Sequence, residues 1–223
     1  MSYKFYDNDK GNTIFNEKNQ KCIFLAEGLS EALFLEKWLS SEEEWSQKSE
    51  FISVICFQGV DKIKATLKRI EQKIRQCLGV GFFLDAEDKK ITDRLKQIED
   101  VLEIHKIIDT GTNKLRAGEL NQISDRNLSS IAIYISPNNK DNGCIEDIVV
   151  EENEIKTWKC IECLRESSEY NNINKSIVQA YLGCKKPGLC GTGRGFESGI
   201  LDVNSSVYSK ITDLFSKLLR NSC

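Results

Sequence analysis

Three acidic residues stand directly behind predicted buried strands, where they could take part in metal chemistry. Glu27 follows the apolar run 22–26, and Asp85 and Glu87 follow the apolar run 79–84. Ligands of an open parallel sheet bind outside the carboxyl ends of its strands, so we expect these side chains to meet at one edge. Asp85 and Glu87 are two residues apart, and on an extended chain their side chains point the same way.

Further acids extend this set. Glu31 comes one helical turn after Glu27 and can face the same space, and Glu146 and Asp147 follow a fourth apolar run. Clustered carboxylates repel one another and are costly to bury without a cation. Mg²⁺ or Mn²⁺ prefers such oxygen ligands, and a bound ion of this kind can polarise a phosphate and activate water. The alternative for Glu31 and Asp147, as for Asp88, is a place in the first turn of a helix, where negative charge is favourable.

The elements that must position these acids alternate along the chain. Unbroken apolar runs predict buried strands at 22–26, 51–57, 79–84 and 131–135, and amphipathic segments such as 63–77 predict the helices between them. This alternation predicts an α/β fold with a Rossmann-like parallel sheet of about four strands and helices on both faces. We expect a surface loop at 40–50.

The C-terminal part of the chain is predicted to be mainly helical. Helices are expected at about 145–169, 175–182 and 206–219, with a glycine-rich loop at 188–199. We therefore expect a single domain over residues 1–223, with a core at about 20–185 and a C-terminal helical extension at 186–223. Whether the last helices form a small cap or cover the sheet is left open.

Composition excludes several classes of protein. The chain has 223 residues and a formal net charge of −3, so it is not a polycation that coats nucleic acid. No apolar run is long enough to cross a bilayer, and the N-terminus has no secretory pattern. We expect a cytoplasmic protein whose nine cysteines are reduced and serve mainly as packing residues.

The acidic motifs resemble those of the Toprim domain. The segment Phe24–Leu35, with Glu27-Gly28, is similar to the first Toprim motif, and Gly81–Glu87 is similar to the second, in which Asp-x-Asp ends a strand. The Glu27-x-x-x-Glu31 spacing resembles the Toprim of the OLD (overcoming lysogenization defect) family nucleases. Small stand-alone Toprim-like proteins of unknown function show a still closer resemblance, which covers about residues 20–185.

The resemblance implies a site for Mg²⁺-dependent cleavage or transfer at phosphodiesters. It implies that Glu27 acts as general acid or base or as a ligand, and that Lys175 stabilises charge on the phosphate. The implied metal ligands are Glu27, Glu31, Asp85, Glu87, Glu146 and Asp147. One departure is Glu87, which stands where the family usually has Asp and which places its carboxylate about one bond length further out.

Other patterns predict weaker alternatives. The segment 83–87 resembles the nucleophile strand of haloacid-dehalogenase-like phosphatases, but the residues after it do not continue the match. Cys160-x-x-Cys163 with two later cysteines could bind zinc, although its helical setting favours packing. The glycine-rich segment lacks the Lys-Ser/Thr of a P-loop, and we expect a mobile loop there whose Arg194 meets substrate. The lone His105 is expected to be structural.

A basic helix and the acidic edge together favour nucleic acid as the substrate. The predicted helix 63–77 and its start carry Lys62, Lys68 and Arg69 on faces away from its apolar stripe, where they could guide a phosphate backbone. We predict a metal-dependent nuclease on DNA or RNA. The alternative is a catalytically weak Toprim-like module that works with a separate partner protein, such as an ATPase.

Overall fold

The centre of the structure is a mostly parallel β-sheet built from the unbroken apolar runs of the sequence. The computed structural model describes residues 5–6, 20–109, 114–123, 128–166 and 173–223. Within these ranges six strands form one sheet in the order β1-β3-β2-β4-β6-β5, and only β5 runs antiparallel to its neighbour. The strands are β1 (Phe5–Tyr6), β2 (Cys22–Ala26), β3 (Ile52–Cys56), β4 (Gly79–Asp85), β5 (Leu120–Gln122) and β6 (Ser130–Ser136).

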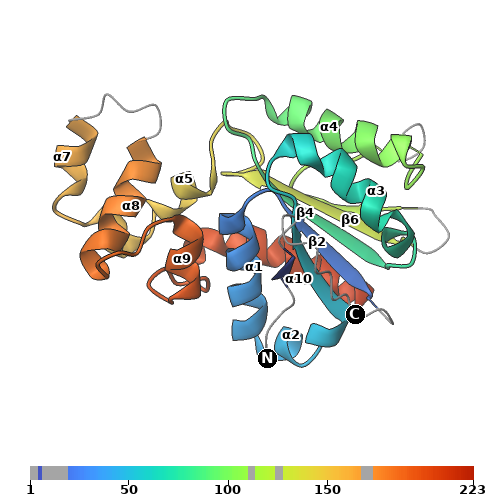
Figure 1. Cartoon of the computed structure of the whole chain (residues 1–223), viewed down its shortest axis with the longest axis horizontal. Coiled ribbons are helices and arrows are strands. Elements are labelled where there is room, and N and C mark those ends of the chain that lie inside the picture. Colours follow the sequence, from blue (N-terminus) through green and yellow to red (C-terminus); the bar gives the residue numbers. More distant parts are fainter. Residues whose placement is uncertain (1–4, 7–19, 110–113, 124–127, 167–172) are drawn as a thin grey trace.

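Helices cover both faces of the sheet, as the alternation predicts. The helices are α1 (Leu29–Ser41), α2 (Glu43–Ser46), α3 (Ile63–Ile74), α4 (Ile91–Ile104), α5 (Ile145–Val149), α6 (Asn153–Lys156), α7 (Ile161–Glu166), α8 (Ile173–Lys185), α9 (Thr192–Glu197) and α10 (Ser209–Ser222). Figure 1 shows α3 and α4 on one side of the strands, and α1 and α10 on the other. None of the helices in the described ranges has the length and apolar character that crossing a bilayer requires.

Each face of the sheet has its own hydrophobic core. Alternate residues of β2 point to opposite faces: Ile23 and Leu25 pack with α3 and α4, whereas Phe24 packs on the side of α1 and α10. On that second side, the Phe215 ring of α10 lies 5.1 Å from Phe24 and 5.9 Å from Phe83. Of the two arrangements that the sequence leaves open, α10 therefore takes the one that covers the sheet.

The C-terminal region differs from the prediction in several places. Three short helices, α5, α6 and α7, stand where one helix is predicted at 145–169. Glu152 has a non-helical backbone conformation (ψ 134°), which separates α5 from α6. Residues 167–169 lie outside the described ranges. The predicted loops at 40–50 and 188–199 contain α2 and α9, and α2 buries Trp45. Figure 1 shows α7 and α8 beside the sheet layers, at the side where α5 begins.

The topology creates a crevice at the carboxyl edge of the sheet. β2 lies between β3 and β4, and β4 lies between β2 and β6. The chain leaves β2 toward β3 and leaves β4 toward β6, so the two connections diverge from neighbouring strands. Divergence of this kind marks the place where open α/β sheets bind ligands. Glu27 and Asp85 stand at the ends of these two strands.

Candidate functional site

Asp85, the last residue of β4, lies at the centre of the acidic cluster. Its Oδ1 accepts a hydrogen bond from the backbone N–H of Ile145 at 3.0 Å, which joins β4 to the start of α5. Burial raises the pKa of Asp85 well above its usual value, and the nearby carboxylates of Glu31, Glu146 and Glu27 raise it further. Asp85, which is half-buried, therefore sits in a strongly negative environment.

Glu31 reaches the same place from α1. Its residue surface is 2% exposed, and its Oε2 accepts a hydrogen bond from the backbone N–H of Gly28 at 2.9 Å. Burial raises the pKa of Glu31 to about 7, and the charges of Glu146 and Glu27 add to this effect. The bond to Gly28 is a helix-capping contact, so Glu31 fills both roles that the sequence suggests: it stands in the first turn of a helix and it belongs to the cluster.

Glu146 enters the cluster from α5 and is oriented by a residue that no sequence pattern marks. The buried Thr192, the first residue of α9, donates its hydroxyl hydrogen to Glu146 Oε1 at 2.5 Å. A threonine in a glycine-rich segment gives no signal for this role, because the bond spans 46 residues of sequence. The contact ties α9 to the acidic cluster.

Glu27 lies beside this group but faces a different neighbour. Its Oε2 accepts a hydrogen bond from the backbone N–H of Asp85 at 3.2 Å, and its Oε1 is 3.6 Å from Arg94 Nη2. No sequence pattern marks Arg94, which stands in the first turn of α4 between Asp93 and Leu95. Its guanidinium is fully buried, and Nη2 also binds Glu87 Oε2 at 2.8 Å.

The side chains of Asp85 and Glu87 point in different directions. The sequence-based prediction that they point the same way assumes an extended chain, and it is wrong here. The backbone takes a left-handed conformation at Glu87 (φ 54°), and its N–H donates to Gly143 O at 2.7 Å. Its side chain is 61% exposed and bound to Arg94. The turn after β4 is thus the physical reason that the second motif places its two acids apart.

Asp147 acts as a helix cap in this structure. Its Oδ2 accepts the backbone N–H of Cys144 at 2.6 Å, and its Oδ1 accepts the side-chain amide of Asn174 at 2.6 Å. Both oxygens are therefore engaged, and the first-turn alternative describes this residue. Asp147 also fastens the start of α8 to α5.

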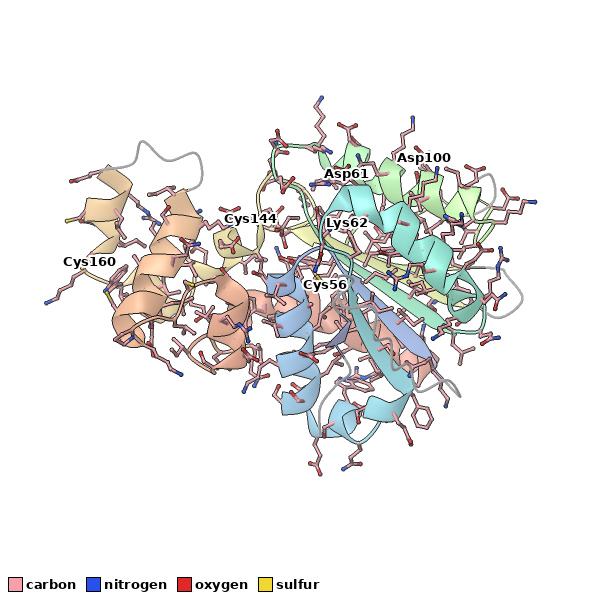
Figure 2. All side chains as sticks on the ribbon, viewed as in Figure 1. Cys56, Asp61, Lys62, Asp100, Cys144 and Cys160 are labelled. Atoms are coloured by element: carbon pink, nitrogen blue, oxygen red, sulfur yellow. The ribbon has the colours of Figure 1, made fainter. Side chains whose placement is uncertain are left out.

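A pocket opens beside the cluster and brings Lys175 to it. The pocket has a volume of about 640 Å³ and lies between the turn after β4, the loop before α5 and the start of α8. Its walls include Asp85, Glu87, Glu146, Asp147 and Lys175. Figure 2 shows Cys144, which also lines the pocket, between the sheet and the helices α7 and α8.

The central carboxylates have no basic partner in the described part of the chain. No lysine or arginine there forms a salt bridge with Glu31, Asp85 or Glu146. Their oxygens accept backbone and threonine donors instead. As the side chains stand, no group of three or more His, Cys, Asp or Glu residues in the described ranges is placed so that it could hold a metal ion. The donor set is nevertheless entirely oxygen, which suits Mg²⁺ or Mn²⁺.

One buried polar atom beside the cluster has no partner. Ser136 ends β6 directly opposite Asp85 in the β4–β6 register, and its hydroxyl is buried without a hydrogen bond. Strand alternation puts Ser136 on the same face of the sheet as Asp85. An unsatisfied buried hydroxyl is costly, so it points to a missing group at this position.

The glycine-rich segment is a packing element. A Cβ on Gly193 would lie 2.9 Å from Leu33 Cδ1 and 3.0 Å from both the Leu29 carbonyl oxygen and Ser30 Cα. The glycine therefore allows α9 to approach α1 closely, and the predicted mobile loop is wrong here. Arg194 is exposed and pairs with Glu197 at 2.5 Å on the same short helix.

The basic residues of α3 lie at increasing distance from the acidic edge. Lys62 stands at the helix start near the edge (Figure 2). Its Nζ donates a hydrogen bond to Gln58 Oε1 at 3.2 Å. Lys68 and Arg69 are exposed and lie six and seven residues further along. At 1.5 Å per residue this is about 10 Å farther from the edge.

The cysteines of the proposed zinc pattern and the single histidine lie away from the acidic cluster. Cys160, Cys163, Cys184 and Cys190 are exposed, so the prediction that they are packing residues is wrong, and Figure 2 shows Cys160 at the end of the molecule remote from the sheet. His105 directly follows α4, and its Nδ1 lies 3.2 Å from Glu71 Oε2.

Most of the chain matches one known protein family. The family model described as "Protein of unknown function (DUF3226)" matches residues 21–220. The chain therefore belongs to the DUF3226 family. Curated proteins and solved structures give no significant match. The DUF3226 match spans the acidic edge, the pocket and most of α10, so these parts belong to one family unit.

Proposed function

We propose that this DUF3226 protein is a Toprim-like, divalent-cation-dependent phosphodiesterase that acts on DNA or RNA. The observation that carries the proposal is the convergence of Glu31, Asp85 and Glu146 at the crevice between β2 and β4, without a basic partner in the described ranges. Such a cluster is stabilised by a cation, and the pocket beside it has room for a nucleotide-sized ligand.

The residues of the site would have different roles in the proposed reaction. Glu31, Asp85 and Glu146 would hold Mg²⁺ or Mn²⁺, and they must turn from their present donors to do so. When bound, the ion lowers the pKa of water and offsets negative charge on phosphate oxygens. Lys175, on the pocket wall, places a further positive charge near the phosphate. Glu27, held by Arg94 and by the Asp85 N–H, is positioned to exchange a proton at its carboxylate.

A second function has an observation in its favour. Each central carboxylate already has a hydrogen-bond donor, and Glu87, which the Toprim pattern places at the metal, is bound to Arg94. These contacts favour a catalytically weak module that binds a nucleotide-like ligand or works with a partner protein such as an ATPase.

Cleavage assays separate the two functions. Plasmid and single-stranded DNA and RNA are incubated with the full chain in Mg²⁺ or Mn²⁺, alongside Asp85→Asn. Asp100→Asn is the matched control, because Asp100 is exposed on the outer side of α4, away from Cys144 at the pocket (Figure 2). The nuclease predicts cleavage that falls at least about 100-fold in Asp85→Asn and stays unchanged in Asp100→Asn. Cation binding without cleavage of any substrate would favour the module.

A further inference from the structure

Arg94 is an unusual residue for the interior of a protein. It is 1% exposed, although arginine is almost never fully buried unless it is paired. Its Nη2 contacts Glu27 and Glu87, its Nε donates to the Ala86 carbonyl at 3.4 Å, and its Nη1 is buried without a partner. The Arg94 guanidinium, in the first turn of α4, thus places a permanent positive charge beside the carboxyl edge of the sheet.

The sheet separates the acids into two groups. Glu27 continues the alternation of Ile23 and Leu25, so it faces the side that α3 and α4 cover, where Arg94 lies. Asp85 continues the alternation of Phe83 and faces the opposite side. On that side Asp85 and Glu146 line the same pocket, and Asp85 Oδ1 accepts the backbone N–H of Ile145, the residue before Glu146. The charges of Glu146 and of Glu31 from α1 act on Asp85.

One group has a basic partner and the other has none in the described ranges. Arg94 supplies one positive charge to Glu27 and Glu87. Glu31, Asp85 and Glu146 have no salt bridge in the described ranges. The unpartnered Ser136 hydroxyl, opposite Asp85, lies on the side of the group that has no basic partner. Both the missing charge and the missing hydrogen-bond partner therefore fall at one position.

We propose that the site takes a single divalent cation, held by Glu31, Asp85 and Glu146, and that the Arg94 guanidinium occupies the place of a second cation by holding Glu27 and Glu87. Arg94 is then a positioning residue. It fixes Glu27 Oε1 and leaves Oε2 on the Asp85 N–H, beside the cation ligands. This inference rests on the proposed function, because it assumes that the acidic cluster binds a cation.

The stoichiometry of Mn²⁺ binding tests it. Mn²⁺ is titrated into the full chain, after removal of metal with a chelator, and followed by calorimetry and electron paramagnetic resonance. We expect one Mn²⁺ per chain. Two carboxylate variants at the same turn form a matched pair: Asp85→Asn should weaken binding by more than about 100-fold, whereas Glu87→Gln should change the affinity by less than about 2-fold.

Variants of Arg94 test the substitution of a second cation directly. Arg94→Met leaves Glu27 and Glu87 without their positive charge, so we expect it to bind two Mn²⁺, and Arg94→Lys should restore one. If Arg94→Met does not fold, the Asp85 and Glu87 pair still decides the matter.

The opposing outcomes are distinct. Two Mn²⁺ on the wild-type chain, one of which is lost in Glu87→Gln, would overturn the role of Arg94 and leave the proposed function standing. A folded Arg94→Met that binds one Mn²⁺ as the wild type does would also overturn that role. No Mn²⁺ on the wild-type chain would overturn the proposed function itself.

Discussion

The close contact of α9 with α1 gives a sharp test of the glycine-rich segment. In Gly193→Ala the new methyl group would lie 2.9 Å from Leu33 Cδ1 and 3.0 Å from two backbone atoms, the Leu29 carbonyl oxygen and Ser30 Cα. The leucine side chain can rotate, but the backbone of α1 cannot move without disturbing the sheet. Overpacking of this kind costs about 1–3 kcal/mol in the free energy of unfolding. For a chain of this length the melting temperature then falls by about 2–12 °C.

Gly183→Ala is the matched control for this substitution. Gly183 lies in α8, and its added Cβ would have nothing within 4 Å. Because alanine favours a helix more than glycine does, this variant should gain about 0.5–1 kcal/mol. Urea denaturation and thermal melting followed by circular dichroism measure both variants. If Gly193→Ala is as stable as the wild type, the packing explanation is refuted. That result would instead favour a ligand-binding role for the glycine-rich segment.

Two further predictions concern a buried carboxyl group and the cysteine thiols. Burial raises the pKa of Glu152 to about 7, while the Tyr208 hydroxyl, which donates to Glu152, opposes this rise. A carboxyl whose folded-state pKa is raised favours the fold below its ordinary pKa of 4.5 and loses that contribution as pH rises to about 7. The stability of Glu152→Gln relative to the wild type should therefore increase across this pH range, and a difference that does not change with pH would contradict the assignment. A chromogenic disulfide reagent should react rapidly with four exposed cysteines in the folded chain. If these four react only after a chelator is added, the result would instead support a bound zinc ion. The rapid group is Cys160, Cys163, Cys184 and Cys190, and the protected group is Cys22, Cys56, Cys77 and Cys144.

The central strands could be predicted because they are buried on both faces. The predicted strand at 22–26 coincides with β2, and the prediction of 79–84 is confirmed to within one residue by β4. An unbroken apolar run of this length has few other places in a folded chain. β5 could not be found in this way, because its sequence Leu-Asn-Gln is polar and only its pairing with β6 makes it a strand.

The acids could be placed at one edge, but their partners could not. The positions of Glu27 and Asp85 follow from the strand ends, and Glu31 follows from one helical turn. The separation of Glu87 depends on a left-handed backbone, and no pattern in the sequence marks it. Arg94 and Thr192 reach the cluster from other elements, and such contacts appear only when the chain is folded.

Anomalous diffraction from crystals soaked in Mn²⁺ tests the central claim most directly. The proposed site predicts one peak within about 2.0–2.6 Å of carboxylate oxygens from Glu31, Asp85 and Glu146. A fully soaked crystal with no peak in reach of Asp85 would contradict it.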